Sequence, residues 1–140
     1  MKRNLIGTLS LVALSLLLNT TGAHAQSAAQ AYVPFAFSVG TAHLPAATYK
    51  IKRAEFDTNY ITICNLNTGA TILSLYQRET PGHVSQKMVF RHVGDQYSLA
   101  QIWGPAATPG MTIPATKRER ERELEVAAAP STQNVEIALK

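Results

Sequence analysis

Hydrophobic positions between residues 31 and 114 follow a period of two, interrupted every few residues by glycine, proline or a polar turn. In 31–39, for example, four large apolar residues alternate with proline and small residues: Val33, Phe35, Phe37 and Val39. Successive side chains of a strand point to opposite faces, so this pattern predicts a strand with one buried face. Repeated short strands without a long helical period predict an all-β fold, either an antiparallel β-sandwich or a small open barrel.

Further strands are predicted at 48–53, 60–66 and 71–76, with a hairpin turn at 67–69. In the first of these, Tyr49 and Ile51 are expected to face the core, and the neighbouring lysines to face outward. The segment 60–66 is apolar on both faces and is expected to be a central strand. Pro34 has no N–H to donate, which places its part of the first strand at an edge or at a strand start.

Residues 87–103 predict a β-hairpin around a two-residue turn at Gly94 and Asp95, because glycine suits the first position of a type II′ turn. This turn sets three pairs opposite each other: His92 with Tyr97, Phe90 with Leu99, and Met88 with Gln101. The face that holds these pairs, extended by Trp103, is assigned to the core. A slip of one residue would exchange the two faces, so the register is expected to be well specified.

The segment 115–129 is charged and predicts a short C-terminal helix, from Lys117 to about Ala128. Thr116 and Glu119 fit a capping box, in which each residue satisfies a backbone N–H of the other. Two helical ion pairs have suitable spacing: Lys117 with Glu121, and Glu119 with Arg122. This helix is either a solvated charged face or a docking helix for a partner. Residues 130–140 are predicted to be a loose tail, with one added strand at 135–139 as the alternative.

The first 25 residues have the pattern of a secretory signal peptide, with Lys2 and Arg3 before an apolar run at 5–18. The small residues Ala23 and Ala25 predict cleavage after Ala25. The apolar run is short for a membrane span of about 20 residues. We therefore expect an exported protein, periplasmic or extracellular, without a membrane span after cleavage. A flexible lead-in at 26–30 would precede the β domain at 31–114.

The composition offers little support for a catalytic or nucleic-acid function. Removal of Lys2 and Arg3 lowers the formal net charge from +4 to +2, too little to indicate nucleic-acid binding. Cys64 is the single cysteine, so no internal disulfide is expected; it is either an inert buried thiol or a reactive one. Three histidines follow the signal segment, and none has metal-ligand spacing: His43, His83 and His92. We expect no catalytic residues, no metal site and no cofactor.

Tyr97, Gln101 and Trp103 are the candidate ligand-binding residues. An indole can stack on a sugar ring while the amide donates and accepts hydrogen bonds, which favours a carbohydrate or another small ligand. Alternatively, Trp103 is a core anchor. Only the face on which the indole lies distinguishes the two interpretations. His92 is interpreted either as a partly buried residue near the turn or as a general base. The sequence offers neither a nucleophile nor an orienting carboxylate for the second role.

Five segments together resemble a family of small exported proteins common in Acidobacteria. They are V-P-F-A-F-S-V-G at 33–40, L-P-A-A-T-Y at 44–49, M-V-F-R-H-V-G-D-Q-Y at 88–97, Q-I-W at 101–103, and the basic-acidic segment at 114–121. The resemblance departs at Ala47, where the family favours glycine. It implies a secreted β-rich domain and assigns no activity, cofactor or site residue.

Three hypotheses follow for the function. The first is a non-enzymatic exported module with a structural or binding role at the cell envelope. The second is a protein that binds a glycan or another small ligand. The third, an enzyme, would require His92, Cys64 and a carboxylate to meet in one cleft.

Overall fold

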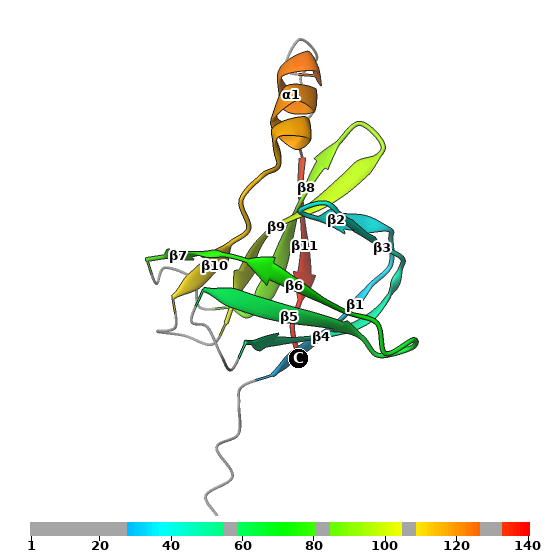
Figure 1. Ribbon diagram of the computed structural model, residues 1–140, viewed down its shortest axis with the longest axis vertical. Coiled ribbons are helices and arrows are strands. Elements are labelled where there is room, and N and C mark those ends of the chain that lie inside the picture. The colour runs from blue at the N-terminus through cyan, green and yellow to red at the C-terminus, as the bar shows by residue number, and fades with distance from the viewer. Residues whose placement is uncertain (1–27, 55–58, 81–84, 105–108, 127–132) are drawn as a thin grey trace, which may run out of the picture.

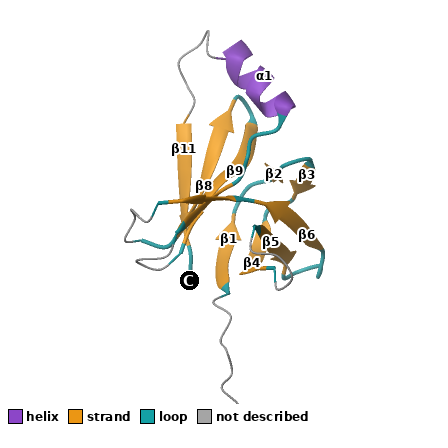
Figure 2. Cartoon of the chain, turned by 60° about the vertical axis from the view of Figure 1, so that its left-hand side comes forward, coloured by secondary structure: helices purple, strands orange, loops and turns teal. Residues whose placement is uncertain are grey.

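The computed structural model describes residues 28–54, 59–80, 85–104, 109–126 and 133–140. It has two facing β-sheets that do not close into a barrel, and one short helix at one end (Figures 1 and 2). The predicted all-β, sandwich-like class with a short C-terminal helix is confirmed. The predicted signal peptide at 1–25, its cleavage site, residues 26 and 27 of the lead-in and His83 lie outside the described residues. The prediction of a flexible lead-in at 26–30 is wrong at Ala29 and Gln30, because both pair within the first strand, β1 (Ala29–Val33).

The first sheet, called sheet A, follows the predicted alternation of buried and exposed side chains. Its order is β1-β4-β5-β6, with β1 at Ala29–Val33, β4 at Ala47–Arg53, β5 at Tyr60–Asn65 and β6 at Thr71–Leu75. Tyr49 and Ile51 face inward and are buried, as predicted. The strand β5 is central, also as predicted, although only one of its faces is buried. The strand β6 forms an edge of the sheet, and its Leu73 and Leu75 are half exposed.

The second sheet, called sheet B, has the order β11-β8-β9-β10-β7. Its strands are β7 at Gln77–Glu79, β8 at Lys87–Val93, β9 at Gln96–Trp103, β10 at Gly110–Thr112 and β11 at Gln133–Ala138. The short strands β2 (Phe37–Val39) and β3 (Ala42–Leu44) join it as a hairpin. The strand β2 runs parallel to β9, an exception to the predicted antiparallel pairing. The core lies between the two sheets, and its largest fully buried members are Val33, Tyr49, Ile61, Ile63, Tyr76, Met88, Phe90 and Ile102.

The single strand predicted at 31–39 is wrong, because the chain breaks between Val33 and Phe37. The strand β1 pairs with β4 in sheet A, while β2 pairs with β3 and β9 in sheet B. Pro34 follows the last residue of β1, where its missing N–H removes a ladder hydrogen bond. The segment 31–39 therefore contributes apolar side chains to the core from both sheets.

The hairpin of β8 and β9 has the predicted turn and the predicted register near the turn. Gly94 has a φ of +60°, a conformation that glycine adopts without steric cost. His92 pairs with Tyr97 and Phe90 with Leu99, as predicted. Beyond Phe90 the register shifts by one residue.

The shift is a β-bulge at Ala100, which has no partner in β8. Met88 therefore pairs with Ile102, not with Gln101 as predicted, and Lys87 pairs with Trp103. One extra residue exchanges the faces of all that follow. Ile102 joins the core between the sheets, whereas Trp103 is buried outside that cluster, on the other face of sheet B. The assignment of Trp103 to the face of Phe90 was wrong for this reason.

The tail at 130–140 contains a strand, so the loose-tail prediction is wrong and its alternative is correct. The strand β11 pairs with β8 along its whole length, from Gln133 opposite His92 to Ala138 opposite Lys87. Two reciprocal backbone hydrogen bonds, of 3.0 and 2.8 Å, then join Gln30 of β1 to Lys140. These bonds tie sheet A to sheet B.

The helix α1 (Lys117–Val126) begins where the capping box places it, and the predicted residues 127–129 lie outside the described part. The Lys117–Glu121 ion pair is present at 3.7 Å. The predicted Glu119–Arg122 pair does not form, since Glu119 turns toward sheet B. None of the residues of α1 is buried. The helix therefore rests on sheet B through polar contacts, among them a 2.9 Å ion pair between Arg91 and Glu123.

Candidate functional site

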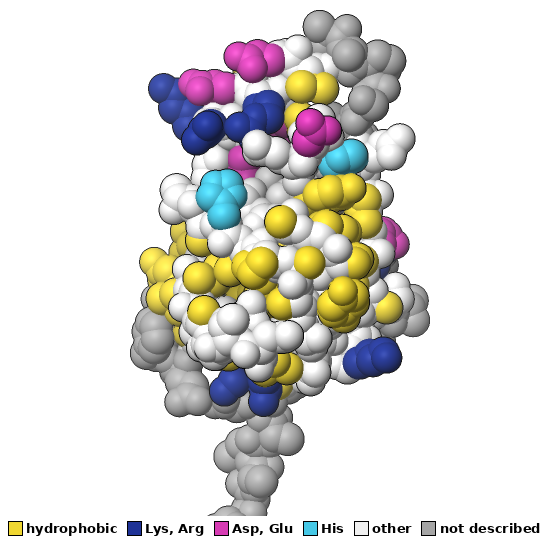
Figure 3. All heavy atoms as spheres, turned by 90° about the vertical axis from the view of Figure 1, so that its right-hand side faces the viewer, with side chains coloured by type: hydrophobic (Ala, Val, Ile, Leu, Met, Phe, Trp, Pro, Cys, Tyr) yellow, Lys and Arg dark blue, Asp and Glu magenta, His cyan; other side chains and the backbone are white. Residues whose placement is uncertain are grey.

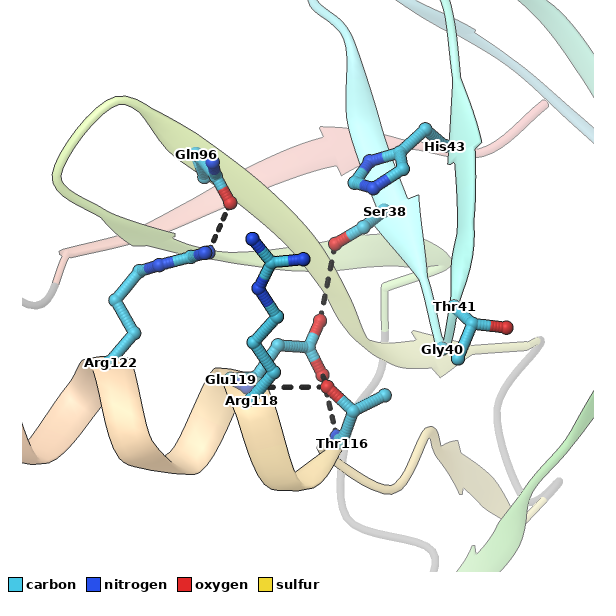
Figure 4. Close-up of a pocket in the computed structure, with 9 residues that line it drawn as sticks. All are labelled: Ser38, Gly40, Thr41, His43, Gln96, Thr116, Arg118, Glu119 and Arg122. Carbon is cyan, nitrogen blue, oxygen red and sulfur yellow. Dashed lines mark hydrogen bonds between the residues drawn. The ribbon is translucent and has the colours of Figure 1, made fainter.

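A cleft of about 230 Å³ lies between the start of α1 and the β2–β3 hairpin (Figure 4). Its lining residues come from three separate segments of the chain: Ser38, Gly40, Thr41 and His43; Gln96; and Thr116, Arg118, Glu119 and Arg122. The parallel pairing of β2 with β9 brings the first and second of these segments together. In Figure 3, charged side chains of both signs and histidine side chains gather at this end of the molecule, above a more apolar middle.

Glu119 connects the start of α1 to two strands of sheet B, β2 and β9. Its Oε2 accepts hydrogen bonds from the Thr116 N–H at 2.7 Å and from the Thr116 hydroxyl at 3.0 Å. Its Oε1 accepts a 3.1 Å bond from the Ser38 hydroxyl, which lies 2.9 Å from the Ser98 hydroxyl. The capping box therefore extends beyond the helix, because the same carboxylate that caps α1 also contacts β2 and β9.

The surroundings of Glu119 favour its charged form. Partial burial by itself would raise the pKa of this carboxyl group. The Thr116 N–H and the hydroxyls of Ser98, Thr116 and Ser38 outweigh burial, and they hold the pKa below its ordinary value. Glu119 is therefore an anion whose oxygens already accept hydrogen bonds from the protein.

This pKa shift predicts a pH-dependent contribution of Glu119 to stability. A lowered pKa in the folded state adds stability above the unfolded-state pKa of about 4.3, and this stability is lost as the pH falls through the folded-state pKa. We expect the free energy of unfolding of Glu119→Gln to lie below that of the wild type near pH 6, and the difference to shrink as the pH falls below about 4.3 and through the lower folded-state pKa. Urea unfolding at several pH values measures it.

Glu125→Gln is the matched control, since Glu125 is an exposed acid of the same helix and does not line the cleft. Its difference from the wild type should stay small throughout the pH range. A constant difference for Glu119→Gln over that range would contradict the prediction.

Three residues that can carry positive charge surround the cleft. Arg118 and Arg122 project from α1, and His43 lies on β3 on the opposite side (Figure 4). The Arg122 guanidinium donates to the side-chain oxygen of Gln96. Within the described part of the chain, the side chains of Arg118 and His43 form no hydrogen bond and no ion pair. The cleft therefore contains hydrogen-bond donors that the protein itself does not use.

Of the three residues predicted from the sequence as ligand contacts, Gln101 and Trp103 contact each other and Tyr97 lies apart from both. Tyr97 is half-buried, and its ring stacks on Phe35 and on His92, at centroid distances of 4.0 and 4.3 Å. Trp103 is only 7% exposed, and its Nε1 donates to the side-chain oxygen of Gln101 at 3.3 Å. Because of the bulge, these two residues lie on the face of β9 opposite Tyr97. The burial of the indole favours the core interpretation of Trp103 over the stacking one.

The residues considered for catalysis are also separated. Cys64 is half-buried on β5 of sheet A, whereas His92 lies on β8 of sheet B. His92 stacks on Tyr97 near the turn, in agreement with the partly buried interpretation. Among the described residues there is no group of three or more His, Cys, Asp or Glu side chains that could hold a metal ion.

The sequence predicted the capping box that forms one edge of the cleft, but not the cleft. The capping box of Thr116 and Glu119 and the charge run of α1 were visible as local patterns. The contribution of Ser38 and His43 was not, because the cleft depends on β2 lying beside β9, residues about 60 positions apart. No local spacing signals that pairing.

Comparison with known proteins identifies no relative: no family model, no curated protein and no solved structure matches the chain. No helix among the described residues is long and apolar enough to cross a membrane.

Proposed function

We propose that this protein is an exported, non-catalytic module of the cell envelope that binds a small polar ligand in the cleft between α1 and the β2–β3 hairpin. The observation that supports this proposal most is the cleft itself, with unused donors on Arg118 and His43 facing a shared space. The N-terminal pattern at 1–25 supports export, and the β-rich domain agrees with the resemblance to small secreted proteins.

The dimensions of the cleft limit what it can take. Pockets for drug-sized ligands measure roughly 300–1,000 Å³, so a volume of about 230 Å³ suits a small molecule or one group of a larger molecule. Ser38 and Gln96 stand on strands, and Arg118 and Arg122 on a helix. Sites on regular elements hold their geometry better than sites on loops, which favours selective binding.

The sugar-stacking form of the second hypothesis and the third hypothesis, an enzyme, have less support. A sugar-stacking site needs an exposed ring face, whereas the rings of Trp103 and Tyr97 are largely covered by neighbouring residues. An enzyme built on His92 and Cys64 would need the two side chains in one cleft, and they belong to different sheets.

The binding half of the proposal is tested with ¹⁵N–¹H NMR spectra of the purified protein. We would titrate a panel of small probes, namely glucose, acetamide, acetate and inorganic phosphate, and follow the amides of the cleft residues. At least one probe is expected to shift them in a saturable manner. The variant Thr41→Trp, which fills the cleft from its edge, should abolish the shifts, and Thr68→Trp in an exposed turn of sheet A should not. Unchanged binding to Thr41→Trp, or no shift with any probe, would overturn the proposal.

The export half predicts a defined N-terminus. When the full chain is expressed in a bacterium with a general secretion pathway, we expect the protein outside the cytoplasm with Gln26 as its first residue. Intact-mass spectrometry of the periplasmic and medium fractions measures this. The control Ala25→Arg places a bulky charged residue at the cleavage site and should block processing. A chain that keeps residues 1–25 in the cytoplasm would contradict export.

A further inference from the structure

The charge distribution around the cleft is uneven. Two guanidinium groups, those of Arg118 and Arg122, and one carboxylate, that of Glu119, line it. The oxygens of Glu119 are occupied by Thr116 and Ser38. The positive end of the α1 dipole lies at the same place and adds to the positive potential. The cleft therefore carries an excess of positive charge.

The neighbouring acids of α1 do not neutralise these arginines. Glu121 lies 3.7 Å from Lys117, and Glu123 lies 2.9 Å from Arg91. Arg122 has a neutral acceptor, Gln96, and Arg118 has none within the described residues. A guanidinium group has five N–H donors, so most of the donors of both arginines remain available to a ligand.

The available donors lie on two sides of the cleft. Arg118 and Arg122 approach from α1, while His43 lies on the β2–β3 side (Figure 4). A group that accepts hydrogen bonds in several directions and carries negative charge satisfies both sides. Phosphate and carboxylate oxygens match the planar fork of arginine, and hydrogen bonds between opposite charges are the stronger ones.

We propose that the cleft binds a small oxyanion, held between Arg118 and Arg122 of α1 and His43 of β3. This inference rests on the proposed function and specifies the chemistry of its ligand. A cation is disfavoured, because the one carboxylate of the cleft already accepts hydrogen bonds to both of its oxygens. A neutral ligand would leave the excess positive charge uncompensated.

The same geometry links binding to the docking of the helix. The helix has no buried side chain, and its contacts with sheet B include the hydrogen bonds of Glu119 and Arg122 and the ion pair of Glu123. An oxyanion that bridges Arg118 and His43 adds a connection between α1 and β3. Bound oxyanion is therefore expected to slow amide hydrogen exchange in α1 more than in the strands of sheet A.

The test is an NMR titration of the purified protein with inorganic phosphate and, separately, with acetate, at constant ionic strength set by sodium chloride. Saturable shifts are expected at the amides of Thr41, His43 and Arg118. Arg118→Gln should weaken the binding by roughly tenfold or more, the loss expected for one charge-assisted hydrogen bond. Binding of phosphate alone would indicate a tetrahedral oxyanion, and binding of acetate alone a carboxylate; either supports the inference.

Arg120→Gln is the matched control, because it removes the same charge from the same helix but does not line the cleft. It should retain binding within about twofold, since an exposed charge acts only through a screened field. Equal weakening by both variants, or shifts that sodium chloride alone reproduces, would overturn the oxyanion site. If glucose or acetamide shifts the cleft while neither anion does, the oxyanion inference fails and the proposed binding function stands. If no probe shifts it, both fail.

Discussion

Substitution of Phe90 by alanine is expected to lower the free energy of unfolding by about 3–5 kcal/mol. Phe90 is fully buried, and its ring meets those of Phe35 and Phe37 edge to face, at centroid distances of 5.2 and 5.1 Å. It also stands on the central strand of three, opposite Leu99 of β9 and Val135 of β11. Removal of the ring leaves a cavity that strands fixed on both sides cannot close.

Urea unfolding, followed by circular dichroism, measures this loss. Tyr32→Ala is the control, since Tyr32 is also an aromatic residue on a strand but is 62% exposed. It should change the free energy of unfolding by about 0.5 kcal/mol or less. Comparable losses for the two variants would show that Phe90 does not hold the position in the core that the structure gives it.

Gly110→Ala is expected to destabilise the protein by about 1–3 kcal/mol through overpacking. A Cβ atom at this position would lie 2.4 Å from Cζ3 of Trp103, and two further ring atoms would be within 2.7 Å. The indole is 7% exposed, so it has little room to move away. Gly110 also pairs with Glu79 of β7, which restrains the backbone on the other side.

A double-mutant cycle with Trp103→Leu identifies the cause. If the indole opposes the new methyl group, the cost of Gly110→Ala should fall in the Trp103→Leu background. Gly69→Ala provides a contrast, because Gly69 has a φ of +75° and nothing lies near its missing Cβ. Its cost of about 1–2 kcal/mol comes from the backbone conformation and should not depend on Trp103. An unchanged cost of Gly110→Ala in the absence of the indole would contradict the packing explanation.

Local patterns predicted most of the strands and the helix, because each depends on nearby residues. The alternation around Tyr49 and Ile51 requires only a period of two and one buried face. The turn at Gly94 needs a residue that tolerates positive φ. The start of α1 follows from the reciprocal bonds of Thr116 and Glu119. Each of these signals lies within a few residues of the structure it determines.

The errors have a common physical origin in contacts between distant segments. The break after Val33 arises because the residues before it pair in sheet A and those after it pair in sheet B. Pro34 alone does not specify this break. The strand β11 exists because the edge of β8 is available to residues about 45 positions later. The bulge at Ala100 carries no glycine or other local mark, so the register beyond it was predicted without the shift.

The cleft could not be predicted for the same reason. Arg118 and Arg122 belonged to a charge run that, in sequence, fits a solvated helix. The docking of α1 on sheet B, in which Glu119 accepts a hydrogen bond from Ser38, turns one side of that helix toward His43. The fold therefore places the charged side chains of Arg118 and Arg122 in one cleft with His43.

The bulge at Ala100 has a consequence for the order in which the hairpin forms. Pairing that spreads outward from Gly94 passes through His92–Tyr97 and Phe90–Leu99, and these pairs are the same with or without the bulge. The contacts that separate the two registers come later and from other strands: Met111 beside Ile102, and Ile137 beside Met88. We therefore expect the turn half of the hairpin to form early, and the half that holds Ile102 and Trp103 to reach its final register only when β10 and β11 pair with it. A chain without β11 would keep the tip of this hairpin. It would lose one of the two strands, β10 and β11, whose pairing determines whether Ile102 or Trp103 enters the core.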